Sequence, residues 1–233
     1  LLGIEIVIIH GGGPFIKQTL DKFKKSTSFI DGLRVTDGET MEIVEMVLSG
    51  KVNKEIVNSI QRHGVASVGI SGKDGNIINA KKKEIDNGDL GFVGEIESVD
   101  TSLIKVLLGN GYLPVISPVG KDEKGETYNI NADYAAVEIA SSLKAQKLIF
   151  ITDVKGVMED INDEESLISL MNLEDAKKSI DENIIQGGMI PKVECCIKAV
   201  ENGTKQVHII DGRMKHSMIL EMFTQEGIGT MFI

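Results

Sequence analysis

Three glycine-containing segments carry residue types and spacings that could bind an anion. The first, Gly11-Gly12-Gly13, follows the apolar run of residues 4–9 and precedes a helical pattern with Pro14 in its first turn. A strand, a glycine turn and a helix N-terminus direct bare N–H groups and the positive end of the helix dipole toward one point. A tight turn alone would need only one glycine, so the triplet favours a ligand site over a purely structural turn.

The second and third segments also lie beside predicted secondary structure. Residues 152–156 directly follow a predicted strand at 148–151, and residues 186–192 lead into a predicted helix at 190–200. Neither has a Gly-Lys-Ser/Thr P-loop or a G-x-G-x-x-G dinucleotide pattern, so a nucleotide site would have another design. Lys192, after Gly187-Gly188, is either a surface lysine that snorkels or a lysine aimed at a phosphoryl group.

Three further polar residues, Asp133, Asn129 and Arg34, need an explanation. Asn131 is a suitable N-cap, which puts Asp133 in the first helical turn, where capping and dipole complementation explain it. Asn129 precedes this cap in an extended segment, and no capping role accounts for it. Arg34 lies in a non-helical stretch and is either part of a surface ion pair or a bidentate clamp for a carboxylate.

Composition excludes several classes of function. The 233 residues have a formal net charge of -10 and a single basic run, Lys81-Lys82-Lys83, which argues against a nucleic-acid partner. No apolar segment is long enough to span a membrane and no signal peptide is visible. The two cysteines, Cys195 and Cys196, are adjacent without zinc-ligand spacing, and the four histidines are scattered. We therefore expect a cytoplasmic protein without a metal cluster.

Strand and helix patterns alternate along the chain, which predicts an α/β fold with a largely parallel open sheet. Ligands in such sheets bind beyond the carboxyl ends of the strands. The chain begins at Leu1-Leu2-Gly3 without a methionine, so we expect an N-terminal segment, including a first strand, to be absent from it. The predicted helices include residues 39–48, 52–60, 132–143, 190–200 and 217–223, and the predicted strands include 4–9, 66–70, 112–116, 148–151, 207–210 and 231–233.

Four motifs, at residues 8–14, 32–36, 129–133 and 187–192, occur in an order and spacing that resembles the amino-acid kinase family from end to end. The resemblance implies a three-layer αβα sandwich with a mainly parallel open central sheet. It also implies one continuous domain with an acyl-amino-acid-binding lobe over residues 1–144 and a nucleotide-binding lobe over residues 145–233.

Two of the motifs narrow the resemblance to one group of members. Gly-Leu-Arg-Val-Thr and Asn-x-Asn-Ala-Asp resemble the motifs of members that use ATP to phosphorylate the side-chain carboxylate of N-acetyl-L-glutamate in arginine biosynthesis. By this resemblance, Gly12 and Gly13 offer N–H groups to the substrate and the transferring phosphoryl group, and Arg34 and Asn129 hold the substrate. Lys192 would stabilise phosphoryl charge, with Asp133 orienting lysines. An ionised carboxylate needs no general base, so positioning and charge neutralisation would carry the reaction.

The resemblance also implies where the nucleotide lies, with Mg²⁺ held mainly by the ATP phosphates. The implied nucleotide-binding residues are Asp153, Gly156, Val157, Met158, Gly187, Gly188 and Met189. The family pattern has a lysine-bearing glycine loop after its first strand, which this chain does not contain. We interpret the difference as truncation.

The C-terminal part resembles the arginine-binding site of feedback-inhibited members through His208, Glu221 and Gly227. The alternative is a core histidine and a solvated glutamate. Such members form homo-oligomers, a dimer or a hexamer joined through an N-terminal helix, and a PII-type signalling protein is a further candidate partner.

Two other functions stay open at this point. One is another acyl-phosphate-forming kinase, acting on glutamate or acetylaminoadipate. The other is a non-catalytic, arginine-sensing regulatory subunit. A dinucleotide-binding module is excluded because the glycine fingerprint is missing.

Overall fold

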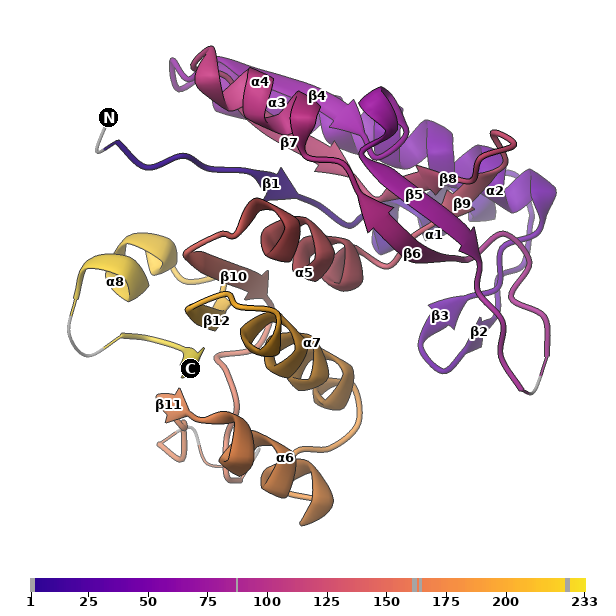
Figure 1. Cartoon of the computed structure of the whole chain (residues 1–233). Coiled ribbons are helices and arrows are strands. Elements are labelled where there is room, and N and C mark those ends of the chain that lie inside the picture. Colours follow the sequence, from indigo (N-terminus) through magenta and orange to yellow (C-terminus); the bar gives the residue numbers. More distant parts are fainter. Residues whose placement is uncertain (1–2, 87, 161–162, 164, 225–226) are drawn as a thin grey trace. The chain divides into compact units, whose positions relative to one another are not determined.

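The computed structural model describes residues 3–86, 88–160, 163, 165–224 and 227–233. The chain forms two compact units, Leu1–Glu138 and Ile139–Ile233, each described here by itself (Figure 1). The assignment of one lobe to the acyl amino acid and the other to the nucleotide, with a boundary after residue 144, stays a prediction.

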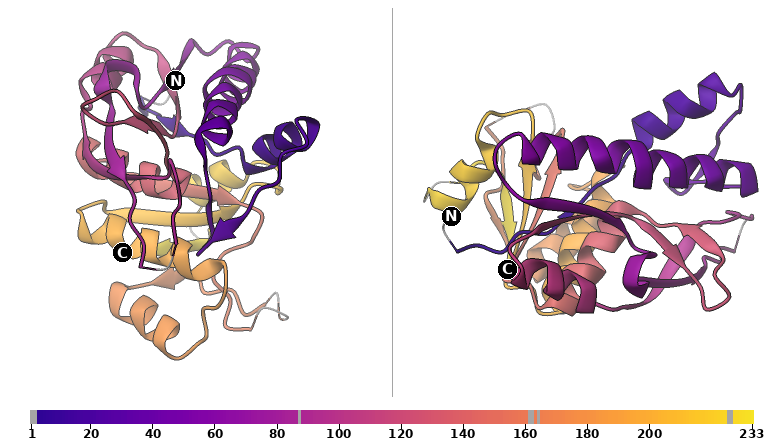
Figure 2. Two further views of the ribbon diagram at one scale, coloured as in Figure 1. Left: turned by 90° about the vertical axis from the view of Figure 1, so that its right-hand side faces the viewer. Right: turned by 90° about the horizontal axis from the view of Figure 1, so that it is seen from above.

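A parallel three-stranded sheet forms the centre of the first unit. Its strands are β1 (Ile8–Ile9), β7 (Leu113–Ser117) and β4 (Ser67–Ser71), in the order β1-β7-β4. β7 is the central strand, and its Val115 and Ile116 are fully buried, as expected of a strand covered on both faces. The sheet is covered by α3 (Asn53–Gln61) and α4 (Ser102–Gly109), which pack on opposite faces (Figure 2).

The predicted strand at residues 4–9 is much shorter than expected. Only Ile8–Ile9 pair, with Val115 and Ile116 of β7, and Ile4 and Ile6 are exposed. Among the described strands β1 pairs only with β7, and the exposed Ile4 and Ile6 show that the apolar run does not form the strand buried on both faces that the sequence predicted.

One long helical rod crosses the first unit, where the sequence predicted two separate helices. It consists of α2 (Gly38–Glu45), the π-helix η1 (Met46–Val52) and α3, without interruption (Figure 2). Asp37 caps its start, because the Asp37 carboxylate accepts a hydrogen bond from Thr40 N at 2.8 Å. With α1 (Gly13–Lys22), this rod encloses a hydrophobic cluster of Ile16, Leu20, Met41, Ile43, Val44, Val47, Leu48, Val52 and Val119.

Smaller elements complete the first unit. The hairpin of β2 (Phe29–Ile30) and β3 (Leu33–Arg34) is antiparallel. A second sheet has the order β6-β5-β8-β9, with β6 (Gly94–Val99), β5 (Ile78–Lys82), β8 (Val119–Lys121) and β9 (Thr127–Asn129). The short 3-10 helix η2 (Asp74–Asn76) precedes β5.

The second unit is built on a mixed sheet of the order β10-β12-β13-β11. β10 (Lys147–Thr152) and β12 (Gln206–Asp211) are parallel over their whole length, β13 (Thr230–Phe232) is antiparallel to β12, and β11 (Leu170–Met171) is parallel to β13. Its helices are α6 (Leu173–Asp181), α7 (Met189–Glu201) and α8 (Ser217–Phe223). The helix α5 (Ala132–Leu143) has the predicted bounds. Parallel strands covered by helices confirm the α/β class.

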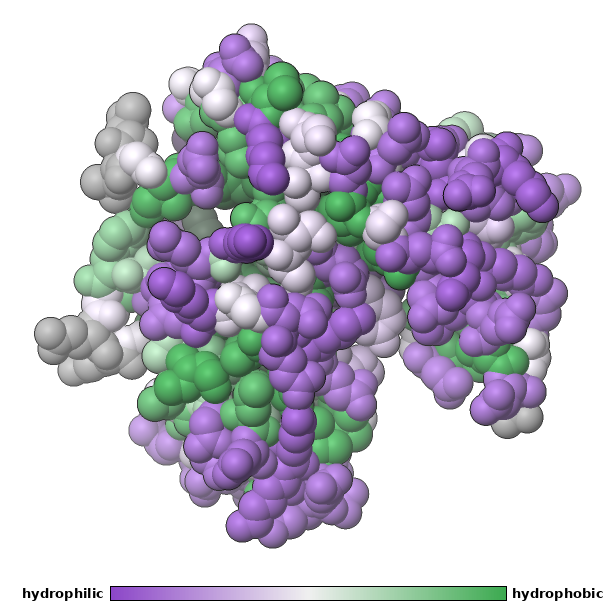
Figure 3. All heavy atoms as spheres, viewed as in Figure 1, coloured by the Kyte–Doolittle hydropathy of each residue, from purple (hydrophilic) through white to green (hydrophobic). Residues whose placement is uncertain are grey.

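The face drawn in Figure 3 is mostly hydrophilic, with hydrophobic residues in separate patches. Among the described residues, no helix is long and apolar enough to cross a membrane.

Candidate functional site

The glycine triplet lies between the end of β1 and the start of α1, as predicted. Gly12 is the N-cap of α1 and has no side chain to satisfy the first N–H groups, while Pro14 lies in the first turn. A Cβ on Gly13 would meet no atom within 4 Å, so there is open space beside the loop. On Gly11 it would be 3.7 Å from the Cβ of Ala132, at the start of α5. The loop therefore has the features of an anion site.

Gly12 itself is held against the π-helix. A Cβ on Gly12 would be 2.6 Å from Leu48 Cδ2, closer than Cβ atoms approach other atoms, and 3.5 Å from Val52 Cγ2, an ordinary contact. Any larger residue here would therefore displace the buried Leu48 side chain of η1.

Arg34 is buried beside this loop, which contradicts the surface ion-pair interpretation. It is 8% exposed, and its guanidinium donates to Thr27 Oγ1 at 2.6 Å and, at 3.4 Å, to the carbonyl oxygen of Gly13. The guanidinium also lies 4.7 Å from the centre of the Phe29 ring. Burial lowers the pKa of Arg34, and among the described residues no acidic side chain forms an ion pair with it. A buried cation of this kind is stabilised by an anionic ligand.

Asn129 reaches the same cluster through Thr36, a fully buried residue that the sequence did not single out. The Thr36 hydroxyl donates to the carbonyl oxygen of Arg34 at 2.7 Å and accepts from Asn129 Nδ2 at 3.3 Å. Gly13, Arg34, Thr36 and Asn129 therefore form one hydrogen-bonded group, which we call the glycine-loop cluster.

Asp133 lies in the first turn of α5, as predicted. Asn131 is the N-cap, because its Oδ1 accepts from Asp133 N at 2.8 Å and from Tyr134 N at 3.2 Å. The role of the Asp133 carboxylate in orienting lysines stays a prediction.

In the second unit, Asp153 follows the carboxyl end of β10, and the turn after it is fixed by Thr230. Thr230 Oγ1 accepts from Val157 N at 2.8 Å and donates to the carbonyl oxygen of Ile168 at 2.7 Å. A Cβ on Gly156 would lie 2.5 Å from the same Oγ1, so the turn approaches Thr230 too closely for another residue. Met158 forms an isolated bridge with Leu167.

A charged pair that the sequence analysis missed lies where β10 and β12 end side by side. Thr152 is in register with Asp211, and Arg213 binds the Asp211 carboxylate through Nε and Nη2, at 2.9 and 2.8 Å. This pairing lowers the pKa of Asp211 to about 2. The sequence could have indicated this pair, because residues 211–213 directly follow the predicted strand at 207–210.

The third glycine segment opens α7, as predicted. Gly187 has a left-handed φ of 56°, Gly188 is the N-cap without a side-chain hydrogen bond, and Met189 is the first residue of the helix. Lys192 is the fourth residue of α7 and is half-buried. Its action together with Gly12 and Gly13 stays a prediction.

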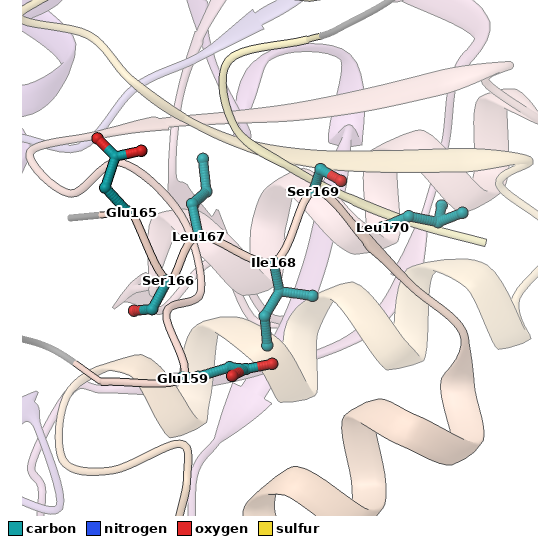
Figure 4. A pocket seen from close by; sticks show the side chains of 7 residues that line it. All are labelled: Glu159, Glu165, Ser166, Leu167, Ile168, Ser169 and Leu170. Carbon is teal, nitrogen blue, oxygen red and sulfur yellow. The ribbon is translucent and has the colours of Figure 1, made fainter. Parts of the chain in front are cut away.

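A hollow of about 350 Å³ in the second unit was not expected from sequence (Figure 4). It is lined by Glu159, Glu165, Ser166, Leu167, Ile168, Ser169 and Leu170. Two carboxylates and no cation in the lining disfavour a phosphate group there, so we do not assign the nucleotide to this hollow.

The three residues that resemble an arginine site lie together in the second unit. His208 Nδ1 is 2.6 Å from Glu221 Oε1, with both side chains buried, and Glu221 Oε2 accepts from Ile228 N and Gly229 N at 2.7 and 3.1 Å. Gly227 has a φ of 62°, and a Cβ on it would be 3.2 Å from Glu221 Oε2. Burial raises the pKa of Glu221, but the Ile228 N–H, His208 and the Gly229 N–H together lower it overall. Glu221 is therefore not the solvated residue of the alternative interpretation.

Glycine loops after strands and before helices are a feature of α/β proteins that bind phosphate groups. A profile of the amino acid kinase family matches residues 1–211. The acetylglutamate kinase of Caldanaerobacter subterraneus subsp. tengcongensis is 58% identical over 230 residues, which are 99% of this chain and 77% of that relative. The acetylglutamate kinase of Methanocaldococcus jannaschii is 52% identical, over 99% of this chain and 80% of that relative.

Two solved structures share the fold of this chain. The smu.665 protein of Streptococcus mutans UA159 superposes with a TM-score of 0.82 at 30% identity, covering 98% of this chain and 85% of that one. An N-acetylglutamate synthase of Neisseria gonorrhoeae, complexed with coenzyme A and N-acetyl-glutamate, gives 0.87 at 26% identity, covering 99% of this chain and 52% of that one. This chain belongs to the amino acid kinase family. The expected αβα sandwich is confirmed.

Proposed function

We propose that the chain phosphorylates the side-chain carboxylate of N-acetyl-L-glutamate with ATP, giving an acyl phosphate for arginine biosynthesis. The observation that carries the proposal is the buried Arg34 guanidinium beside Gly13, which has no acidic partner among the described residues. An acid with a free α-carboxylate supplies the missing anion. The names of the relatives, acetylglutamate kinase, support this acid.

In the proposed reaction, a carboxylate oxygen of the substrate attacks the γ-phosphorus while the bond from that phosphorus to the β–γ bridging oxygen breaks. ADP leaves with the bond electrons, and no proton moves. Gly12 and Gly13 donate N–H groups to the phosphoryl oxygens, Arg34 and Asn129 hold the acid, and Lys192 neutralises developing charge. Asp133 orients the lysine side chains.

The nucleotide is proposed to lie along Asp153–Met158 and Gly187–Met189, in the second lobe. Among the described residues, no group of three or more His, Cys, Asp or Glu could hold a metal ion. Any Mg²⁺ is therefore proposed to arrive on ATP, held by its phosphates. We place the enzyme in the cytoplasm and propose that it is a homo-oligomer, a dimer or a hexamer, with a PII-type protein as a candidate regulator.

The test is release of ADP, with the acyl phosphate trapped by hydroxylamine, in separate assays of N-acetyl-L-glutamate, glutamate and N-acetyl-aminoadipate. We expect turnover with the first acid. Preference for another acid would assign a different acyl-phosphate-forming kinase, and no turnover with any of the three acids would favour the regulatory subunit.

We also propose that arginine inhibits this activity by binding near His208, Glu221 and Gly227. Two observations support a cationic, hydrogen-bonding ligand. The Glu221 carboxylate is buried, and His208 Nε2 has no hydrogen-bond partner among the described residues. Rates that do not change at millimolar arginine would contradict the proposal.

A further inference from the structure

The peptide unit between Gly11 and Gly12 is held at one end by the side chain of His10. His10 Nδ1 lies 2.9 Å from the Gly11 carbonyl oxygen. Because a carbonyl only accepts, Nδ1 carries the proton. Nε2 of the neutral ring is then an acceptor, and it faces Asn53 Nδ2 at 3.2 Å. The two contacts define a single tautomer of a buried imidazole.

Asn53 ties this imidazole to the central sheet. It is fully buried, and its Nδ2 also lies 2.9 Å from the carbonyl oxygen of Val115 in β7 and 3.2 Å from that of Ile70 in β4. Turning the carboxamide over would place its oxygen against these two carbonyl oxygens, so the direction of donation is determined. The two N–H hydrogens of Nδ2 are thus shared among three acceptors, which link the segment after β1 to both other strands of the sheet.

The backbone around Asn53 is shaped to admit it. A Cβ on Gly69 would lie 1.9 Å from Asn53 Oδ1, so only glycine leaves room for the carboxamide. Lys54 Nζ donates to Asn53 Oδ1 at 3.0 Å and to the carbonyl oxygen of Gly69 at 2.7 Å. Asn53 is also the first residue after the π-helix, whose wider turn sets the direction in which it points.

We infer that His10, fixed by Asn53, is a positioning residue that aims the N–H of Gly12 at the phosphoryl group. The Gly11 carbonyl and the Gly12 N–H are opposite ends of one planar trans peptide. A hydrogen bond that fixes the carbonyl therefore fixes the N–H and directs it away from the ring. Glycine backbone is otherwise free to rotate, so the loop needs such a restraint. The inference rests on the proposed function, in which the Gly12 N–H binds phosphoryl oxygen.

The ring stays neutral in this arrangement. Burial lowers the pKa of His10, the hydrogen bond to Gly11 raises it, and the Lys54 ammonium of α3 lowers it further, with a net decrease. A second proton on Nε2 would face the N–H of Asn53 and remove the hydrogen bond between them.

The first test is the ¹⁵N spectrum of the imidazole in the wild-type protein at neutral pH. We expect the shifts of an Nδ1–H tautomer for His10. An Nε2–H tautomer would overturn the inference, because the ring could not then hold the Gly11 carbonyl. This test needs no turnover, so it stands even if N-acetyl-L-glutamate is not the substrate.

The second test compares kcat of variants of the protein with N-acetyl-L-glutamate and ATP. His10→Leu removes the donor and should lower kcat about 10- to 100-fold, with a smaller change in KM. His10→Asn places an amide donor near the Nδ1 position and should recover much of the loss. The control is His63→Asn, at an exposed histidine that contacts a helical carbonyl (Ser59).

A kcat of His10→Leu within about twofold of wild type would overturn the inference. If His10→Leu is unfolded at the assay temperature, His10→Gln replaces it, since its amide lies near the Nε2 position and loses the Gly11 contact. A higher kcat for His10→Gln than for His10→Asn would also overturn it. An inactive wild type would instead contradict the proposed function.

Discussion

At the scale of single residues, Arg34 is a buried guanidinium whose charge costs free energy to remove from water. Its guanidinium is held by Thr27, by the Gly13 carbonyl and by the face of Phe29, and none of these neutralises it. We therefore expect an anionic substrate that binds beside Arg34 to recover the free energy spent on burying this charge.

Arg34→Lys should mainly raise KM for N-acetyl-L-glutamate, by about tenfold or more, because an ammonium cannot make the planar, forked contacts of a guanidinium. Steady-state kinetics at saturating ATP would measure this. Arg62→Lys, at an exposed arginine, is the matched control. An unchanged KM would return Arg34 to a structural role.

Lys192→Ala should lower kcat roughly 10²- to 10³-fold if its ammonium neutralises charge in the transition state. Lys198→Ala, at an exposed position of α7, should leave the rate near that of wild type. Circular dichroism of both variants would show whether the helix persists. A modest loss of kcat would favour the surface-lysine interpretation instead.

His10 should make the folded chain less stable in mild acid. Its pKa is lowered on folding, so the unfolded chain binds the proton more readily as the pH falls below about 6.5. The free energy of unfolding should therefore fall through this range. Urea titrations of wild type and His10→Asn at several pH values would isolate the effect, because the variant lacks the titrating ring and its curve should be flatter.

At the scale of elements, Thr230 binds two segments that are distant from it in sequence. Thr230→Val should destabilise the second unit by about 1–3 kcal/mol, because Val157 N and the Ile168 carbonyl lose their buried partner. We also expect KM for ATP to rise as the Gly156 turn loosens. Thr224→Val, which removes a hydroxyl from an exposed helix end, is the control. Equal melting temperatures for the two variants would contradict the assignment.

How much of each element the sequence predicted depends on how local its determinants are. α5 has the predicted bounds, because its Asn131 cap and its alanine-rich face act within a few residues. The long rod was predicted as two helices, since the π-helix, which contains Ser49 and Gly50, breaks the 3.6-residue period although the backbone continues as a helix. β1 was overestimated because an apolar run does not reveal whether a strand has one neighbour or two.

The candidate site was predicted in part for the same reason. Glycine loops and charged residues with unusual neighbours can be identified from sequence. Thr36, Asn53 and Thr230 cannot, because each also has a partner that lies 17 or more positions away, as with Asn129 and Thr36, which are 93 positions apart. Only the fold brings these side chains to the backbone they hold.

At the scale of the whole molecule, each compact unit carries its own proposed ligands. A ligand that binds one folded unit stabilises it, so binding can be measured as a rise in melting temperature. Arginine should raise the melting temperature by about 5 °C or more at a hundredfold excess over its Kd. Differential scanning calorimetry of wild type and Glu221→Gln would test this, since the variant loses the charge that Ile228, Gly229 and His208 support. An equal shift in both proteins would place arginine elsewhere.

The π-helix also determines where this protein can lose a residue. A π-turn contains one residue more than an α-turn, so deleting one residue from Met46–Val52 would give a continuous α-helix whose later positions keep nearly their direction about the axis. Deleting one residue from α2, which is already α-helical, would instead rotate every later position by roughly 100° relative to the residues before the deletion. Leu48 would then turn away from Gly12 and Asn53 from the strands, although no residue of the glycine loop had been altered. Single deletions should therefore be tolerated better within Met46–Val52 than within α2.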